Sequence, residues 1–318
     1  KESDITFEYE YKIKVFDNGM VSELRKPKIS LSNLNYGNIS KEVKFSARVA
    51  QPLIGLGLIE NINDEDILRN EDEFDSNNDG ISGKANITWD RVNKQKTLGR
   101  FGWKASQPSI YQQTADALFN DMGLSNPLHP NPSNCTESQV HCQNIPNGNS
   151  FEYDNLEVSN QQLDLITFYT QQLGVPSRRD IDSKNVIAGK KIFFELSCNS
   201  CHTEKFKTGN KSEHKNLNSQ IIYPYSDFLL HDLGEGLADG LSEYNANGSE
   251  WRTPPLWGLG LTKVVSGRKT YLHDGRARNL IEAILWHEGE AIRARNKFLK
   301  LDKNKINQLL SFLESLYI

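Results

Sequence analysis

Residues 198–202 read Cys-Asn-Ser-Cys-His, and this pentapeptide constrains the chain more than any other feature. Two thiols three positions apart can form thioether bonds with the two vinyl groups of a haem, and His202 then lies under the iron as its proximal ligand. The pattern therefore predicts covalent haem at Cys198 and Cys201. Two other interpretations stay open, a redox-active dithiol and half of a zinc site.

Both flanks of the pentapeptide have a helical pattern. Apolar residues recur at helical spacing over 188–196, directly before Cys198. The segment 305–316 is amphipathic, and c-type cytochrome domains place there the helix that packs on the first one. We therefore expect two packed helices next to the attachment cysteines.

Composition indicates a globular protein of about two domains. The 318 residues are 37% hydrophobic, and no apolar run approaches the length of about 18 residues that a membrane span needs. The 37 basic and 41 acidic residues are mixed along the chain, which excludes a nucleic-acid surface built from clustered Lys and Arg. The sequence starts at Lys1 with neither an initiator Met nor a signal peptide, so we expect a mature form or an excised portion.

The cysteines also bear on the compartment. Bacteria attach haem through thioethers outside the cytoplasm, so we expect a periplasmic protein. Cys135 and Cys142 could close a short disulfide loop in the same compartment, or could be two free thiols in a polar loop. Their spacing does not suit a second pair of zinc ligands.

The N-terminal half mixes strand, helix and loop patterns. Residues 5–24 alternate as a β-hairpin does, with a turn at 17–19. A short helix is expected at 64–70 and a loop at 126–150. A second helix is predicted over 161–173, and its expected buried stripe consists of Leu163, Ile166, Phe168, Tyr169 and Leu173.

A domain boundary is expected in the polar segment 177–185, which follows Pro176. The haem-bearing segment begins directly on its far side. We therefore predict one domain over residues 1–180 and a second over 181–318.

The sixth ligand of the iron is expected to be a histidine, because no methionine follows the pentapeptide. The candidates are His214, His231, His273 and His287. His214 lies in a lysine-rich loop and is expected to be solvated. His287 ends a predicted helix over 280–287 at the edge of the core, although a histidine in such a place is more often structural than a ligand.

A second metal site is predicted at residues 75–81. Calcium loops require oxygen side chains at positions 1, 3 and 5, a glycine at position 6 and a backbone carbonyl at position 7. These are supplied by Asp75, Asn77, Asp79, Gly80 and Ile81. Position 12 is Asn86 in place of the bidentate Glu, so either the affinity is below that of an EF-hand, or a carboxylate such as Asp72 or Asp90 completes the ligand shell. The alternative is a plain Asx-rich turn.

Longer motifs resemble those of a known family. The segments 249–259, 271–277 and 282–291 are similar to bacterial di-haem oxidoreductases, also described as peroxidases or thiol oxidoreductases. These are relatives of the di-haem cytochrome c peroxidases and of the MauG proteins. Further similar segments, spread over almost the whole chain, are 52–58, 81–83, 98–105 and 225–234.

The resemblance implies roles for several residues near the haem. In the peroxidase relatives, the distal ligand of the C-terminal haem lies fourteen residues after the histidine of the motif that 271–275 resembles. Fourteen residues after His273 stands His287, which the resemblance therefore implies as sixth ligand. Two imidazole ligands imply a low-spin haem of low potential. His273 would support the haem, and Arg252 and Arg276 would pair with its propionates or be structural.

One departure from the family matters most. The relatives carry two CxxCH motifs and this chain has one, so residues 1–176 resemble the remainder of a first haem domain. In the relatives, a Gln and a Glu assist the peroxide site there. Residues 111–122 resemble that region loosely, with Gln113 and Asp121 as candidate catalytic counterparts or as parts of an ordinary helix.

The combined expectation is a mainly α protein with cytochrome c-like domains and β-hairpin and long-loop insertions. Haem c and calcium are the expected cofactors. The expected function is a periplasmic oxidoreductase of the di-haem peroxidase class. Its C-terminal haem would take electrons from a small periplasmic donor and relay them toward a peroxide-reducing haem, with hydrogen peroxide as candidate substrate. The alternatives are a non-enzymatic electron carrier and a haem-free fragment of the di-haem protein.

Overall fold

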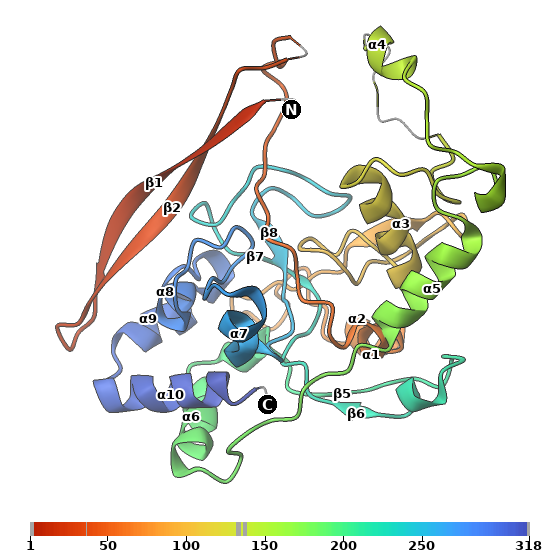
Figure 1. Ribbon diagram of the computed structural model, residues 1–318. Coiled ribbons are helices and arrows are strands. Elements are labelled where there is room, and N and C mark those ends of the chain that lie inside the picture. The colour runs from red at the N-terminus through yellow and green to blue at the C-terminus, as the bar shows by residue number, and fades with distance from the viewer. Residues whose placement is uncertain (1–2, 36, 132–134, 136–138, 317–318) are drawn as a thin grey trace.

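The computed structural model describes residues 3–35, 37–131, 135 and 139–316 (Figure 1). Helices make up 31% of the structure and strands 18%. Every sheet within the described residues has two strands. The predicted mainly α cytochrome c-like fold is therefore wrong, and the fold is mixed α/β. The physical reason is that long segments between the helices, rich in Gly, Pro and Asn, pair locally as short antiparallel ladders.

The elements follow one another along the chain as short units. The strands are β1 (Asp4–Val15), β2 (Val21–Ser32), β3 (Ile87–Asp90), β4 (Gln95–Leu98), β5 (Phe206–Lys207), β6 (Ile221–Ile222), β7 (Leu230–Asp232) and β8 (Glu250–Arg252). The helices are α1 (Leu56–Glu60), α2 (Asp64–Leu68), α3 (Ile110–Asn120), α4 (Val140–Gln143), α5 (Asn160–Gln171), α6 (Lys184–Glu195), α7 (Thr262–Ser266), α8 (Leu280–Leu285), α9 (Ile292–Leu299) and α10 (Lys303–Glu314). No helix of the described chain has the length and apolar character to cross a membrane.

The N-terminal hairpin is confirmed, and it is longer than predicted. β1 and β2 pair from Asp4 opposite Ser32 to Val15 opposite Val21. The turn closes through the Phe16 amide, which donates to Met20 O at 2.9 Å, and Gly19 takes the positive φ of 80° that the turn requires. Figure 1 shows this ribbon along one side of the molecule.

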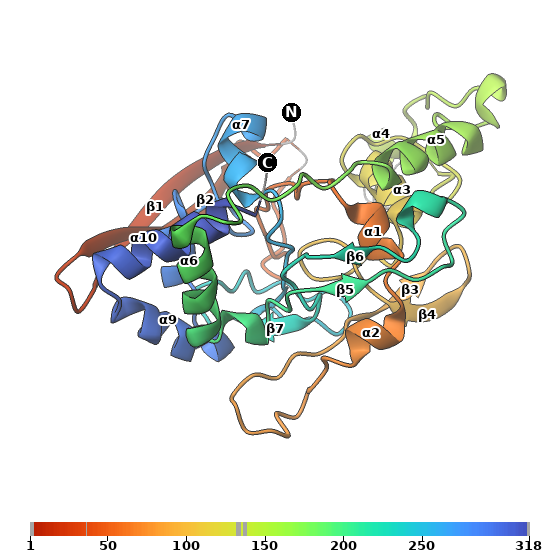
Figure 2. The ribbon, with the colours of Figure 1, turned by 90° about the horizontal axis from the view of Figure 1, so that it is seen from below.

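The two helices beside Cys198 and Cys201 are confirmed. α6 begins four residues earlier than predicted and α10 two residues earlier, and the two pack on each other (Figures 1 and 2). The crossing is close at Gly189, where an added Cβ would lie 1.9 Å from Gln308 O. A glycine at this point lets the helix backbones come into direct contact.

Two main clusters of apolar side chains form the core. The first joins the hairpin turn to α6, α8, α9 and α10, through residues such as Phe16, Phe193 and Phe312. The second joins α1 and α2 to later segments, through residues such as Ile59 and Phe228. The division into domains at 177–185 stays a prediction.

The predicted buried stripe of α5 is mostly wrong, because only one of its members within the helix is buried. Leu163 is fully buried, whereas Ile166, Phe168 and Tyr169 are exposed. Thr167 and Thr170 are the other buried residues of this helix. Positions 163, 167 and 170 lie on one helical face, and that face packs toward α3.

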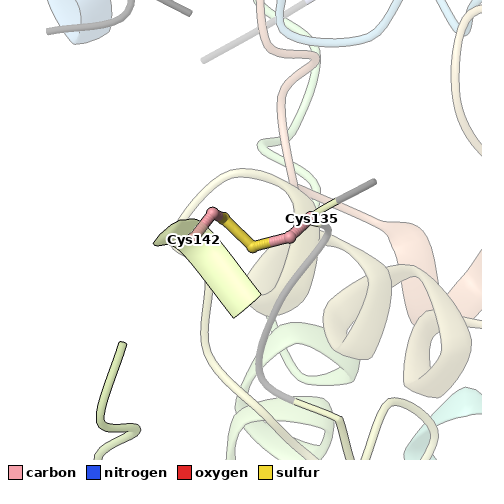
Figure 3. The surroundings of a disulfide bond; sticks show 2 residues. All are labelled: Cys135 and Cys142. Carbon is pink, nitrogen blue, oxygen red and sulfur yellow. A yellow bond between two sulfur atoms is a disulfide. The ribbon is translucent and has the colours of Figure 1, made fainter. Parts of the chain in front are cut away.

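Cys135 and Cys142 form a disulfide, with their Cα atoms 5.8 Å apart (Figure 3). This confirms the first of the two interpretations of this pair. The bond also removes both sulfurs from the set of ligands that a zinc site could use.

Candidate functional site

The pentapeptide forms a tight turn directly after α6. Cys198 begins a single 3-10 turn, and the His202 amide donates to Cys198 O at 3.0 Å. This turn places both sulfurs and the imidazole beside one cavity. The two cysteines are free thiols, which is the state that thioether formation needs.

The imidazole of His202 is held in one orientation. Its Nδ1 donates to Tyr225 O at 2.8 Å, because a carbonyl can only accept. The proton is therefore on Nδ1, and Nε2 keeps its lone pair. Burial lowers the pKa of His202 to about 4, so the ring is neutral near pH 7. Metal-binding histidines commonly donate their other N–H in this way.

His287 repeats this arrangement on another segment of the cavity wall. It lies two residues beyond the end of α8, so the predicted helix over 280–287 is too long at its C-terminus. Its Nδ1 donates to Ala283 O at 2.7 Å. Burial lowers the pKa of this imidazole as well. His202 and His287 line the same cavity.

The cavity between these histidines has a volume of about 1270 Å³ and extends toward α1 and β8. Around the cysteines its wall is apolar, formed by Phe193, Leu256, Leu280, Ala283, Leu309 and Leu313. No hydrogen bond to Nε2 of His202 or of His287 is found among the described residues. Two neutral imidazoles with free Nε2 atoms, two thiols and an apolar wall together fit a haem.

The thiols do not have the character of a redox dithiol. Burial, followed by the neighbouring Cys201, raises the pKa of Cys198 to about 12. Burial also raises the pKa of Cys201. Reactive cysteines need the opposite shift, because the thiolate is the nucleophile. This argues against the dithiol interpretation of the pentapeptide.

His231 lines the same cavity as Cys198, Cys201 and His202, with both of its ring nitrogens engaged. Its Nε2 donates to Asp227 at 2.8 Å and its Nδ1 to Glu290 at 2.7 Å. Burial alone would lower the pKa of His231, but the carboxylate of Asp227 outweighs it and holds this pKa well above the ordinary value. An imidazolium offers no lone pair to iron, which argues against His231 as the sixth ligand.

The sequence had not indicated this cluster of Asp227, His231 and Glu290. Cys201 Sγ lies 3.5 Å from His231 Nδ1, and Glu290 follows His287 by three residues. The cluster therefore connects the attachment turn to the segment that carries His287. The available signal was the spacing of four residues between Asp227 and His231.

The other two candidate histidines lie in different surroundings. His214 packs edge-on against Phe168, with 5.1 Å between ring centroids, and does not line the cavity. His273 does line the cavity, is buried, and stacks on Trp251 with 3.8 Å between ring centroids. The structure therefore brings His273 together with His202 and His287.

Acid is expected to destabilise the chain through His273. Burial lowers the pKa of His273 from 6.5 to about 4, although Asp274 opposes the shift. As pH falls below 6.5, the unfolded chain takes up the proton first, so the stabilising contribution of this group is complete above that pH and is lost toward pH 4. Between about pH 7 and 5 the free energy of unfolding is expected to drop by about 2 kcal/mol on account of His273.

Urea unfolding of the parent and of His273→Gln at both pH values measures this difference. The variant is expected to lose less stability on acidification, because the unfolded chain has one group fewer to protonate. Equal losses in the two proteins would contradict the prediction.

The two arginines that were expected near a haem differ from each other in their partners. Arg276 forms an ion pair with Asp274 at 2.7 Å and does not line the cavity. Arg252 lines the cavity and donates to Gly102 O at 2.8 Å. Within the described residues Arg252 makes no ion pair, and burial lowers its pKa to about 10. A buried guanidinium without a carboxylate partner suits an anionic group of a ligand.

The two candidate catalytic residues of α3 are separated by the structure. Gln113 lines the cavity, and its Oε1 is buried with no hydrogen-bond partner found among the described residues. Asp121 is exposed at the C-terminal end of α3 and does not line the cavity.

The loop at 75–81 turns its oxygen side chains onto its own backbone. Asp75 accepts from the Gly80 amide at 3.1 Å, Asn77 from the Asp79 amide at 2.8 Å, and Asp79 from the Ile81 amide at 2.9 Å. These contacts occur in an Asx-rich turn, so both interpretations of the loop stay open.

The possible further calcium ligands differ in position. Asn86 is buried and donates to Lys104 O at 2.7 Å, and Asp90 accepts from the Val92 amide at 2.8 Å. Asp72 accepts from the Ser76 amide at 2.8 Å and thus lies against the loop. Of these three residues, Asp72 has the best position to complete a ligand shell.

Comparisons with known proteins bear on the family. No curated protein matches the chain. A solved structure of Kuenenia stuttgartiensis hydrazine synthase pressurised with 20 bar xenon is similar at 14% identity, over 88% of this chain and 98% of that chain. Its TM-score is 0.33, which is too low to support an argument. A family described as "Di-haem oxidoreductase, putative peroxidase" matches residues 3–316, and the chain therefore belongs to the di-haem oxidoreductase family.

Proposed function

We propose that this chain binds one haem c, which Cys198 and Cys201 would hold covalently and whose iron His202 and His287 would bind. The chain would act in a periplasmic oxidoreductase of the di-haem peroxidase class and transfer electrons toward the site where peroxide is reduced. The main support is the matched pair of neutral imidazoles, each fixed by a backbone carbonyl, at one apolar cavity beside both thiols. A bound haem supplies one-electron chemistry at its iron.

The side chains around the cavity have separate tasks in this proposal. His202 and His287 present Nε2 lone pairs in fixed directions, so little entropy is lost when they bind iron. The apolar wall would keep water away from a bound haem. Arg252 would neutralise a propionate, and the cluster of Asp227, His231 and Glu290 would keep the two ligand segments in place.

The peroxide side of the proposal involves the N-terminal part. Gln113 is the stronger candidate for a catalytic role there, because its buried Oε1 at the cavity lacks a partner. Asp121 would have to move from the exposed end of α3 to take part. Hydrogen peroxide and a small periplasmic electron donor are the proposed substrates, and residues 1–180 and 181–318 the proposed functional halves.

The periplasmic location has support from the disulfide between Cys135 and Cys142, because such bonds persist in oxidising compartments. Thioether attachment of haem points to the same compartment.

A non-enzymatic electron carrier is the second candidate function. It is favoured by the same pair of histidines, since two protein ligands leave no open position on that iron. The optical spectrum distinguishes the two candidates. Low-spin bands alone favour a carrier, whereas an additional peroxide-reactive signal favours the enzyme. A chain without a Soret band would be the haem-free fragment.

Covalent haem is expected in protein produced with a cytochrome c maturation system. The intact mass should rise by about 616 Da, the mass of one haem that adds to two thiols. The double variant Cys198→Ala/Cys201→Ala is the control and should show no added mass. An unmodified mass for the parent from the same cells would contradict the proposal.

Calcium is proposed at Asp75, Asn77 and Asp79, with Ile81 O and Asp72 completing the shell. An ion that binds only the folded chain raises the melting temperature once its concentration exceeds its dissociation constant. Melting is therefore expected to shift upward with added calcium in the parent and not in Asp75→Ala/Asp79→Ala. Equal melting temperatures of the parent in chelator and in millimolar calcium would contradict this site.

A further inference from the structure

Strand β1 has an open edge. Within the described residues it pairs with β2 alone, and β2 is the strand that contacts α8. Its 12 residues therefore present a row of backbone N–H and C=O groups that no other strand covers. A long edge of this kind is a template for pairing with a further strand.

The side chains of β1 alternate between an apolar face and a charged face. One face carries six apolar residues that are 39 to 59% exposed: Ile5, Phe7, Tyr9, Tyr11, Ile13 and Val15. The other face carries two acids followed by two bases, namely Glu8, Glu10, Lys12 and Lys14. The charges on the two sides of Tyr11 are therefore opposite in sign.

This pattern selects one antiparallel register between two copies of β1. With Tyr11 opposite Tyr11, Glu8 faces Lys14 and Glu10 faces Lys12 of the other copy. On the apolar face, the same register sets Phe7 opposite Val15 and Tyr9 opposite Ile13, and the two Tyr11 rings opposite each other. Both kinds of cross-strand pair are favourable.

Neighbouring registers are unfavourable. A slip of two residues one way sets Glu10 opposite Glu10, and a slip the other way sets Lys12 opposite Lys12. A slip of one residue sets the apolar face of one strand beside the charged face of the other. Only the register centred on Tyr11 avoids all of these conflicts.

The charges of the folded chain support the same partner. Lys12, Lys14 and Arg295 share a single carboxylate, with nitrogens 3.5, 4.0 and 2.8 Å from Oε1 of Glu288. This end of the ribbon therefore has an excess of positive charge. Glu8 and Glu10 are exposed and form no ion pair among the described residues. In the register centred on Tyr11, the acids of each copy lie beside the basic end of the other.

We propose that β1 is a dimerisation edge, through which two copies of this chain pair antiparallel about Tyr11 into a four-stranded sheet ordered β2, β1, β1, β2. The proposal is independent of haem and of the proposed function. It commits to a second copy as partner, because the charge pattern of β1 is complementary to itself.

Sedimentation velocity of the haem-loaded chain tests the proposal, with two charge-reversed variants. Glu8→Lys/Glu10→Lys and Lys12→Glu/Lys14→Glu each place like charges opposite one another in a homodimer. Each is expected to weaken self-association by about tenfold or more. An equimolar mixture of the two variants restores opposite charges at every pair, so heterodimers are expected to form again.

The control variant is Lys94→Glu/Lys96→Glu, which makes the same two charge changes at exposed lysines at the start of β4, outside the β1–β2 ribbon. It is expected to dimerise like the parent. A monomeric parent at about 100 μM, where even weak contacts of this kind form, would overturn the proposal. So would a parent dimer that both reversals leave intact, or variants that do not associate on mixing.

A cross-linking experiment tests the register itself. Directly opposite residues of antiparallel strands have Cα atoms about 4.5 to 5.5 Å apart, which a disulfide can span. Tyr11→Cys is therefore expected to form a covalent dimer on mild oxidation, whereas Tyr9→Cys is not. Efficient cross-linking of Tyr9→Cys without Tyr11→Cys would overturn the register.

Discussion

Replacement of His287 by alanine is expected to convert a low-spin ferric spectrum into a high-spin one. The Nε2 of His287 carries a free lone pair, because Nδ1 donates to Ala283 O at 2.7 Å. Loss of this ligand leaves the iron with His202 alone, and a haem with one strong axial ligand is typically high-spin. Optical and electron paramagnetic resonance spectra measure the change. Increased reactivity with peroxide is the second expected result, since a coordination position becomes accessible.

His273→Ala is the matched control. His273 lines the same cavity, but it is stacked on Trp251 and lies 3.6 Å from Asp274. Its removal is expected to leave the iron low-spin and to lower stability. A spin change in His273→Ala together with none in His287→Ala would mean that the two histidines have exchanged roles. Loss of haem from both variants would be detected by intact mass and separated from a spin change.

Local sequence patterns predicted those strands and helices whose pattern lies within their own residues. The alternation of β1 and the glycine of its turn were enough to predict the hairpin. The second half of β2 was not predicted, because Lys26, Pro27 and Lys28 do not alternate. Pro27 is tolerated opposite Tyr9 in this two-stranded ladder, and only the pairing with β1 defines the segment as a strand.

The candidate site was predicted where a motif fixes the chemistry. Cys198, Cys201 and His202 were placed by their spacing, and His287 by resemblance to the peroxidase relatives. In the ion cluster around His231, the spacing of Asp227 was the available signal, whereas the contribution of Glu290 could not be predicted, because this residue comes from a distant segment. Glu290 lies 59 residues along the chain from His231, and sequence spacing carries no signal over that separation.

The prediction of the fold class was wrong for a related reason. The helices beside the pentapeptide have clear apolar periodicity, which favours a mainly α fold, but most of the chain lacks it. Between residue 203 and α8, however, the chain forms short strands, such as β7 and β8, that pair with each other across a long loop. The same limitation applies to α5, because most of its apolar residues, unlike Leu163, are not on the face that α3 covers.

Replacement of Gly189 by alanine is expected to destabilise the chain, although the same change inside an ordinary helix stabilises it by about 1 kcal/mol. The added Cβ would lie 1.9 Å from Gln308 O and 2.8 Å from the Cβ of Phe312. Backbone atoms of α10 cannot move aside locally, so the two helices must separate. Overpacking of this kind costs roughly 1 to 3 kcal/mol and outweighs the gain in helix propensity.

The larger change Gly189→Val is expected to reduce haem incorporation as well, because α6 leads directly into the turn that holds Cys198. Thermal unfolding measures the first effect and intact mass the second. Gly174→Ala is the control, since nothing lies within 4 Å of its added Cβ and its φ is not in the left-handed region. That variant is expected to be as stable as the parent. If Gly189→Ala melted at or above the temperature of the parent, α6 and α10 could not be in backbone contact at this residue.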